Sequence, residues 1–168
     1  VIVKEAGRSR IAESIETVQI NLREIQPTLF FAVPRIWEKI HATILIKLND
    51  ATRVKRMFNA VGLKLAGFIA KDRVANNGDF TWKSRLAYAI GNPLMFRALK
   101  ERVGLRRCRW AGTGAAAIAP EVLEFFMGFG VPVYELYGMT ENSAVATLNH
   151  HGRVKVGTVG EPYADIGL

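Results

Sequence analysis

The chain has 168 residues, of which 49% are hydrophobic and 23% charged, with a formal net charge of +8. This hydrophobic content excludes general disorder and suffices for one domain with a sizeable core. No apolar run approaches the roughly 20 residues that a membrane-spanning helix needs, and the single cysteine excludes an internal disulfide.

Positive charge gathers in the middle of the chain. Residues 1–33 carry no net charge, residues 34–109 carry seventeen basic and five acidic side chains, and residues 110–168 have a net charge of −4. A run of charge is usually a solvated helix face, and contact with a membrane surface is the other interpretation. Nucleic acid is not indicated, because no recognition motif accompanies the charge.

Two further features indicate where the protein is located and whether the chain is part of a larger protein. Cys108 lies in an apolar, strand-like stretch, which indicates a buried, inert thiol and favours a cytoplasmic location. The chain begins without Met and stops within a predicted strand, so we expect an internal piece of a larger protein.

The first third of the chain predicts a helix, a strand and a second helix. Glu16–Ile25 has apolar residues at helical spacing, and a proline follows it. Thr28–Val33 is a short, nearly continuous apolar run, which is typical of a strand covered on both faces. Pro34 then opens the next helix, where its missing N–H costs nothing.

The middle of the chain predicts further helices. From Ile44 to Ala75 the pattern is helical and basic, and one apolar face is expected. Two shorter helices are predicted around Lys83–Ile90 and Leu94–Val103, separated by Gly91-Asn92-Pro93. The residues expected to share the apolar face of the first stretch are Ile44, Leu48, Phe58, Leu65 and Phe68.

The next stretch predicts strand, loop, helix and strand. Arg107–Ala111 reads as a strand that runs into Gly112-Thr113-Gly114, and a helix follows from Pro120. Because a strand and Glu135 come next, the order resembles a dinucleotide-binding fingerprint, and an NAD(P)-dependent oxidoreductase is one alternative function. Against it, Pro120 places the helix start several residues after the glycines, whereas the fingerprint helix begins among them.

The strand predicted at 132–136 leads into Tyr137-Gly138-Met139-Thr140-Glu141. Gly138 breaks the strand, so Tyr137 is expected at its end and Thr140 and Glu141 on the loop beyond. Ligands of open α/β sheets bind at strand ends. An aromatic face, a hydroxyl and a carboxylate suit a base, a phosphate and a metal ion respectively.

This segment resembles the Tyr-Gly-x-Thr-Glu motif of the AMP-forming adenylating enzymes. Phe31–Ile40 resembles the Val-Pro-Arg-x-Trp-Glu-Lys segment of their long-chain acyl-CoA synthetase branch, and Gly157–Pro162 resembles the Gly-x-Val-Gly-x-Pro turn of the family. The segments occur in the family's order. We therefore interpret residues 1–168 as part of an adenylation domain that lacks the upstream phosphate loop and the C-terminal domain.

The resemblance implies a long-chain fatty acid–CoA ligase. Such an enzyme activates a fatty acid with ATP to an acyl-adenylate and then transfers the acyl group to CoA. The implied fold is α/β, with a mainly parallel sheet whose strands at 28–33, 107–111 and 132–136 are covered by helices. Because the family's phosphate loop, ribose site and catalytic lysine are absent from these 168 residues, we expect this piece alone to be inactive.

The resemblance also implies roles for single residues. Tyr137 would stack on adenine, Thr140 would bind the α-phosphate, and Glu141 would hold Mg²⁺, so Thr140 and Glu141 are the catalytic candidates. Gly114, Ala115 and Ala116 would lie against the nucleotide or the acyl chain, and Gly138 would belong to the nucleotide site. Glu135 occupies a position from which some members of the family reach the adenine amine. For Gly114, Ala115 and Ala116, tight helix–strand packing is an equally good explanation of the small side chains.

Three hypotheses stay open at this point: an adenylating ligase, the NAD(P)-dependent oxidoreductase, and a non-catalytic basic module that binds membranes. The expected partners of the first are a fatty acid, ATP and CoA. Peripheral membrane contact would involve the basic region 34–109, at the inner membrane face.

Overall fold

The computed structural model describes residues 2–5, 8–11, 18–50, 52–139, 146–149 and 152–162. The elements in chain order are β1 (Ile2–Glu5), β2 (Arg8–Ile11), α1 (Val18–Ile25), β3 (Leu29–Ala32), α2 (Pro34–Asn49), α3 (Arg53–Ala75), α4 (Trp82–Gly91), the π-helical turn η1 (Asn92–Phe96), α5 (Arg97–Val103), β4 (Trp110–Thr113), α6 (Pro120–Gly128), β5 (Val133–Tyr137), β6 (Thr147–Leu148) and β7 (Glu161–Pro162).

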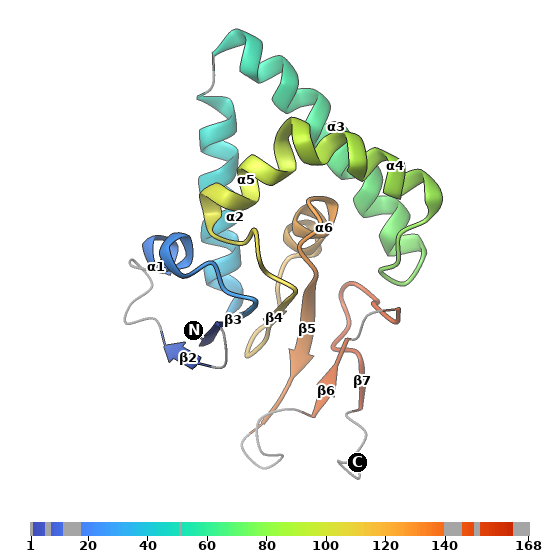
Figure 1. Cartoon of the computed structure of the whole chain (residues 1–168). Coiled ribbons are helices and arrows are strands. Elements are labelled where there is room, and N and C mark those ends of the chain that lie inside the picture. Colours follow the sequence, from blue (N-terminus) through green and yellow to red (C-terminus); the bar gives the residue numbers. More distant parts are fainter. Residues whose placement is uncertain are drawn as a thin grey trace.

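The strands form a sheet with the order β2-β1-β3-β4-β5-β6-β7. Its three central strands are parallel, with Phe30 opposite Ala111 and Ala111 opposite Val133. Antiparallel strands extend the sheet on both sides. The helices gather above the strands in Figure 1, while β6 and β7 lie below and to the right. The expected α/β fold with parallel strands in these three regions is confirmed.

Trp37 is the centre of the core between the sheet and the helices. Its side chain is fully buried on α2, and its ring meets Phe30 of β3 and Phe126 of α6 edge-on, at centroid distances of 5.0 and 4.9 Å. The indole Nε1 donates a hydrogen bond of 3.2 Å to the carbonyl oxygen of Gly112 on β4. One side chain thus joins two helices and two strands.

A buried arginine fixes the far end of α3. Arg73 donates from Nε to the Gly78 carbonyl at 2.8 Å and from Nη1 to the Met127 carbonyl at 3.0 Å, and its guanidinium lies 4.3 Å from the Phe80 ring centroid. Burial lowers the pKa of Arg73. The cation satisfies a carbonyl at the C-terminal end of α6, where a positive charge is favoured.

The strand predicted at 107–111 is displaced along the chain. β4 begins at Trp110 and continues to Thr113, so the prediction was wrong for its first three residues. Cys108 instead closes a turn, since its N–H donates to the Leu105 carbonyl at 3.2 Å and its Sγ donates to the Trp110 carbonyl at 3.2 Å. Burial raises the pKa of the Cys108 thiol to about 12, which confirms the inert cysteine.

The basic helical stretch contains two helices, because the chain turns between α2 and α3. Ile44 and Leu48 are buried on α2, whereas Phe58 and Phe68 on α3 are each 46% exposed, so the single apolar face expected here was wrong. The chain also does not break at Pro93. The π-helical turn η1 carries it from α4 into α5, and the wider turn tolerates a residue without an N–H.

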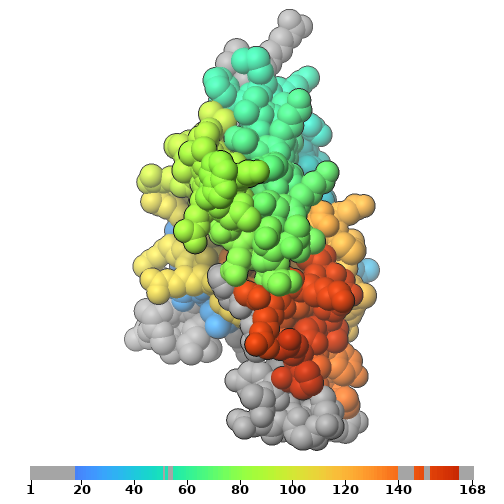
Figure 2. Space-filling model, turned by 90° about the vertical axis from the view of Figure 1, so that its right-hand side faces the viewer, coloured from blue at the N-terminus to red at the C-terminus, as the bar shows by residue number. Residues whose placement is uncertain are grey.

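The outer surface of α3 and α4 carries several exposed apolar side chains. They include Trp82, which is 73% exposed, and Leu86 and Ile90 at successive turns of α4. These two helices form the upper part of the face in Figure 2. None of the helices that the structure describes is long and apolar enough to cross a membrane. Contact of region 34–109 with a membrane surface, and a cytoplasmic location, stay predictions.

Replacing Trp37 by Phe should lower the free energy of unfolding by about 2–4 kcal/mol, because the Gly112 carbonyl loses its indole donor and a gap opens between the rings. Urea denaturation would measure the change. Trp82→Phe is the matched control, since Trp82 is exposed and its replacement should stay within about 0.5 kcal/mol. Equal effects of the two variants would contradict the central position of Trp37.

Candidate functional site at the carboxyl ends of the parallel strands

The carboxyl ends of β3, β4 and β5 meet at one edge of the sheet because the three strands are parallel. At this edge Ala32 is opposite Thr113, and Thr113 is opposite Glu135. β5 extends two residues further and points away from the helices in Figure 1. This edge is where open α/β sheets bind ligands.

Tyr137 is the last residue of β5, as predicted. Its side chain is 46% exposed, so one part of the ring packs on the protein while the rest faces solvent. Its carbonyl accepts a hydrogen bond of 2.8 Å from the Ala146 N–H, and Tyr137 is opposite Thr147 of β6. The backbone under this aromatic ring is therefore held on both sides, by β4 near its start and by β6 at its end.

The three small residues after β4 have two different environments. Gly114 is buried, and a Cβ there would lie 2.8 Å from Leu136 Cδ1 and 2.9 Å from the Leu136 carbonyl oxygen. Packing against β5 therefore requires the glycine. Ala115 and Ala116 are exposed, and Ala115 has a φ of +71°, which is rare for a residue with a side chain. Such strain is often kept where a backbone meets a ligand.

Two buried hydroxyl groups flank the end of β5. The Oγ1 atoms of Thr113 and Thr147 have no hydrogen-bond partner among the described residues. Thr113 is opposite Glu135 and Thr147 is opposite Tyr137, and side chains two apart on a strand share a face. All four side chains therefore lie on one side of the sheet. Neither threonine stands out in the sequence, because the burial of its hydroxyl group without a partner arises only when distant strands pair.

Glu135 has a partner within the fold. Its Oε2 accepts a hydrogen bond of 3.0 Å from the Gly157 N–H. Burial raises the pKa of the Glu135 carboxyl, and the bond from Gly157 opposes this rise. Gly157 has a φ of +79°, which residues with a side chain rarely adopt, so the backbone conformation favours glycine here. A role of Glu135 toward adenine stays a prediction.

Asn149 positions the loop that reaches Glu135, although Asn149 was not among the residues predicted from the sequence to form the site. The side chain is only 1% exposed; its Nδ2 donates to the Thr158 carbonyl, and its Oδ1 accepts from the Lys155 N–H at 3.2 Å. Its own backbone N–H donates to the Glu135 carbonyl at 3.0 Å. In sequence this asparagine opens a polar segment and resembles any loop residue.

Thr140 and Glu141 lie outside the described residues, so their predicted roles stay predictions. Gly138 directly follows β5, as expected of the residue that ends the strand. Within the described part of the chain, no three His, Cys, Asp or Glu residues come together as a metal site.

The geometry contradicts the dinucleotide-binding alternative. α6 begins at Pro120, well beyond the glycines, so its N-terminus is not adjacent to them. A Cβ at Gly112 would lie 2.4 Å from the Trp110 ring, and the Gly112 carbonyl accepts the hydrogen bond from Trp37. Both Gly112 and Gly114 are therefore required by packing of the protein itself, and neither opens a cradle for a pyrophosphate.

Comparisons with known proteins identify relatives of this chain. The sequence model of a family described as AMP-binding enzyme matches residues 7–168. A Mycobacterium tuberculosis protein named as a fatty-acid–CoA ligase is 37% identical over 147 residues, which cover 86% of this chain and 25% of that protein. A long-chain-fatty-acid–CoA ligase of Xenopus laevis is 33% identical over 145 residues, covering 86% of this chain and 19% of the relative.

A long-chain acyl-CoA synthetase of Arabidopsis thaliana, named as peroxisomal, is 35% identical over 144 residues, which cover 84% of this chain and 19% of the relative. The chain thus spans between 19% and 25% of the length of these three relatives.

The raised pKa of Glu135 predicts a pH dependence. A carboxyl that binds its proton more tightly in the folded state stabilises the fold most below its unfolded pKa, near 4.5, and this contribution is lost as the pH rises through the folded value. Glu135→Gln keeps an acceptor for Gly157 and removes the titration. Its stability relative to the unchanged protein should therefore rise with pH from about 4.5 upward, as measured by urea denaturation between pH 4 and 8.

Glu38→Gln is the control for this titration, because Glu38 is an exposed carboxylate on α2. A flat difference for Glu135→Gln across this pH range would show that burial does not perturb the Glu135 carboxyl.

Proposed function

The chain belongs to the family of AMP-binding enzymes, and on this premise we propose that it is part of an ATP-dependent long-chain fatty acid–CoA ligase. The observation that carries the proposal is the half-exposed ring of Tyr137 at the end of β5, while Ala115 and Ala116 are exposed beyond the end of the neighbouring strand β4. This edge coincides with the family's nucleotide motif. The names of the relatives support a fatty acid as the substrate.

The proposed reaction has two steps. In the first, a carboxylate oxygen of the fatty acid attacks the α-phosphorus of ATP, the bond to pyrophosphate breaks, and an acyl-adenylate forms. In the second, the thiol of CoA attacks the acyl carbon, AMP leaves, and the thiol proton is released. The main physical obstacle of the first step is repulsion, because an anion must approach a polyanion, and fixed donors and cations reduce it.

Tyr137 would hold the adenine ring by stacking, which needs a rigid aromatic face on a supported backbone. The sheet provides that support, since Tyr137 ends a strand that is bonded to β4 and β6. The exposed backbone around Ala115 would lie along the nucleotide, since a methyl group allows close approach. Thr140, three residues beyond Tyr137, would donate a hydrogen bond from its hydroxyl group to the α-phosphate.

Glu141 would bind a magnesium ion, which when bound offsets the negative charge of the phosphates. Magnesium sites that act on nucleotides commonly use one or two carboxylates and complete their coordination with phosphate oxygens and water. Such a site fits an edge at which no three acidic, histidine or cysteine side chains of the described residues come together.

Glu141→Gln should slow fatty-acid-dependent pyrophosphate exchange about 100-fold, because losing roughly 3 kcal/mol of charge stabilisation in the transition state has that effect. Gln has the same size as Glu, so melting temperatures should be unchanged. Glu161→Gln is the matched control, since Glu161 is an exposed carboxylate that pairs with Arg153. A folded Glu141→Gln protein with unaltered exchange at all magnesium concentrations would end the assignment.

Tyr137→Ala should mainly weaken nucleotide binding, by about 1–3 kcal/mol if base–aromatic stacking in other proteins is a guide. Tyr137→Phe keeps the ring and should bind ATP almost normally. Isothermal titration with ATP compares the two variants. If both lost the same affinity, the hydroxyl and not the ring would be responsible, and stacking would be the wrong explanation.

A further inference from the structure

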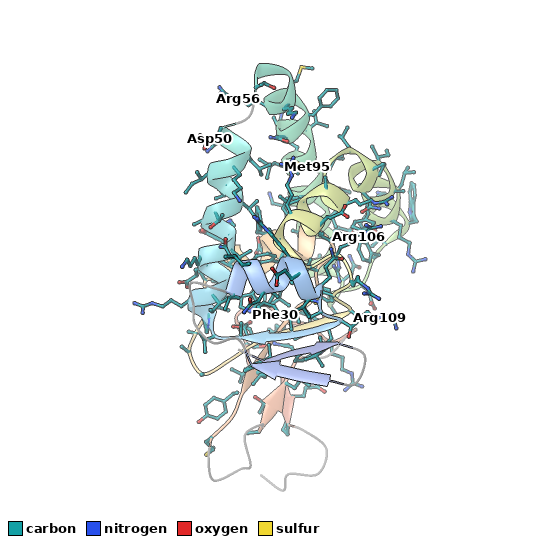
Figure 3. All side chains as sticks on the ribbon, turned by 60° about the vertical axis from the view of Figure 1, so that its left-hand side comes forward. Phe30, Asp50, Arg56, Met95, Arg106 and Arg109 are labelled. Atoms are coloured by element: carbon teal, nitrogen blue, oxygen red, sulfur yellow. The ribbon has the colours of Figure 1, made fainter. Side chains whose placement is uncertain are left out.

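A deep groove lies among the helices, under the arch that α2 and α3 form in Figure 1. Its volume is about 430 Å³, which is within the usual range for small-molecule sites. Its walls come from α1, α2, the start of α3, η1 and α5, and Figure 3 shows Met95 of η1 between α2 and α3. The apolar side chains that form most of the lining include Ile40, Ile44, Leu48, Phe58, Leu94 and Met95.

Among the described residues, the charged side chains that line the groove are all positive. They are Arg23 of α1, Lys47 of α2, Lys55 of α3 and Arg102 of α5. No carboxylate of the described residues forms an ion pair with Lys47 or Lys55. An apolar hollow with cations at its sides is complementary to a molecule that has an apolar body and an anionic end.

The neutral polar groups of the lining already have partners inside the protein. Gln19 Nε2 donates to Thr43 Oγ1 at 3.1 Å, and Asn59 Nδ2 donates to the Leu48 carbonyl at 3.1 Å. Few uncharged groups are therefore left to orient a polar ligand. Arg23 Nε donates to the Arg102 carbonyl, whereas Lys47 and Lys55 form no ion pair with a carboxylate of the described residues. The free positive charge of the two lysines favours an anionic amphiphile over a sugar or a peptide.

The groove is separate from the sheet edge at which the carboxyl ends of β3, β4 and β5 meet. None of its lining residues belongs to β4, β5 or the loops that follow them. The junction of α2 and α3 is at the top of Figure 1, whereas β5 ends near the bottom. A molecule in the groove would therefore not place its anionic end beside Tyr137.

We propose that this groove is a second binding site for a long-chain acyl anion, distinct from the site of the reaction. The acyl chain lies on the apolar walls, and the anionic head lies among Lys47, Lys55 and the two arginines. Two molecules share this chemistry, a free fatty acid and a fatty acyl-CoA thioester. The inference depends on the proposed function only for the choice of an acyl chain as the apolar body.

Equilibrium dialysis of radiolabelled palmitate against the complete protein tests the proposal. The unchanged protein should bind two equivalents, and the double variant Lys47→Glu/Lys55→Glu should bind one, with affinity at the lost site reduced at least tenfold. Ala98→Trp, which fills the groove from α5 without changing its charge, should have the same effect. Competition with palmitoyl-CoA distinguishes the sources, since the tighter competitor is the ligand of the groove.

The matched control is Lys39→Glu/Lys71→Glu, which makes the same change of charge at exposed positions of α2 and α3 outside the groove. It should still bind two equivalents. The inference is overturned if the control loses the second equivalent as well, because the attraction would then be non-specific. It is also overturned if the groove variants bind as many equivalents as the unchanged protein, as they would if another part of the protein filled the groove.

Pyrophosphate exchange in the same variants separates this inference from the proposed function. If the groove variants bind one equivalent and exchange normally, both the second site and the ligase are supported. If they instead lose the dependence of exchange on palmitate, the groove is the reacting site and the second site is wrong. If the unchanged protein binds two equivalents of palmitate but shows no pyrophosphate exchange, the proposed function is overturned and the binding site in the groove is still supported.

Discussion

The structure depends on the contact that Trp37 makes between the helices and the parallel sheet. Parallel strands need helices over them, because their connections and their apolar side chains must be covered. Trp37 supplies much of that cover, since it packs on Phe30 and Phe126 and donates to the carbonyl of Gly112. The hydrogen bond from Trp37 reaches β4 at Gly112, two residues before Gly114. The position of the carboxyl edge of β3, β4 and β5 therefore follows from the packing of α2.

The parts of the fold that the sequence predicted are those governed by local chemistry. Pro34 and Pro120 each open a helix, because a residue without an N–H fits the first turn. β5 ends at Tyr137, directly before a glycine, and the apolar run before α2 is a strand in which partly buried and buried residues alternate. In each case a few neighbouring residues decide the conformation, and a resemblance to a family motif then suggested what the strand end binds.

The parts that the sequence did not predict depend on partners far away in the chain. Thr113 and Asn149 are ordinary polar residues until β4, β5 and β6 pair. The Thr113 hydroxyl is then buried without a partner among the described residues, and the Asn149 amide holds a loop. The start of β4 was misplaced because Cys108 forms a turn with Leu105. Phe58 was misassigned to a buried face, because apolar spacing does not tell where two helices separate.

The central claim is that the end of β5 binds an adenylate with Tyr137 against its base. A crystal structure of the complete protein with a non-hydrolysable acyl-adenylate analogue tests it most directly. The account predicts the adenine ring stacked on the Tyr137 ring, with the nucleotide running along the backbone of Ala115 and Ala116. An analogue bound elsewhere, with Tyr137 and Ala115 in contact with water alone, would contradict the account.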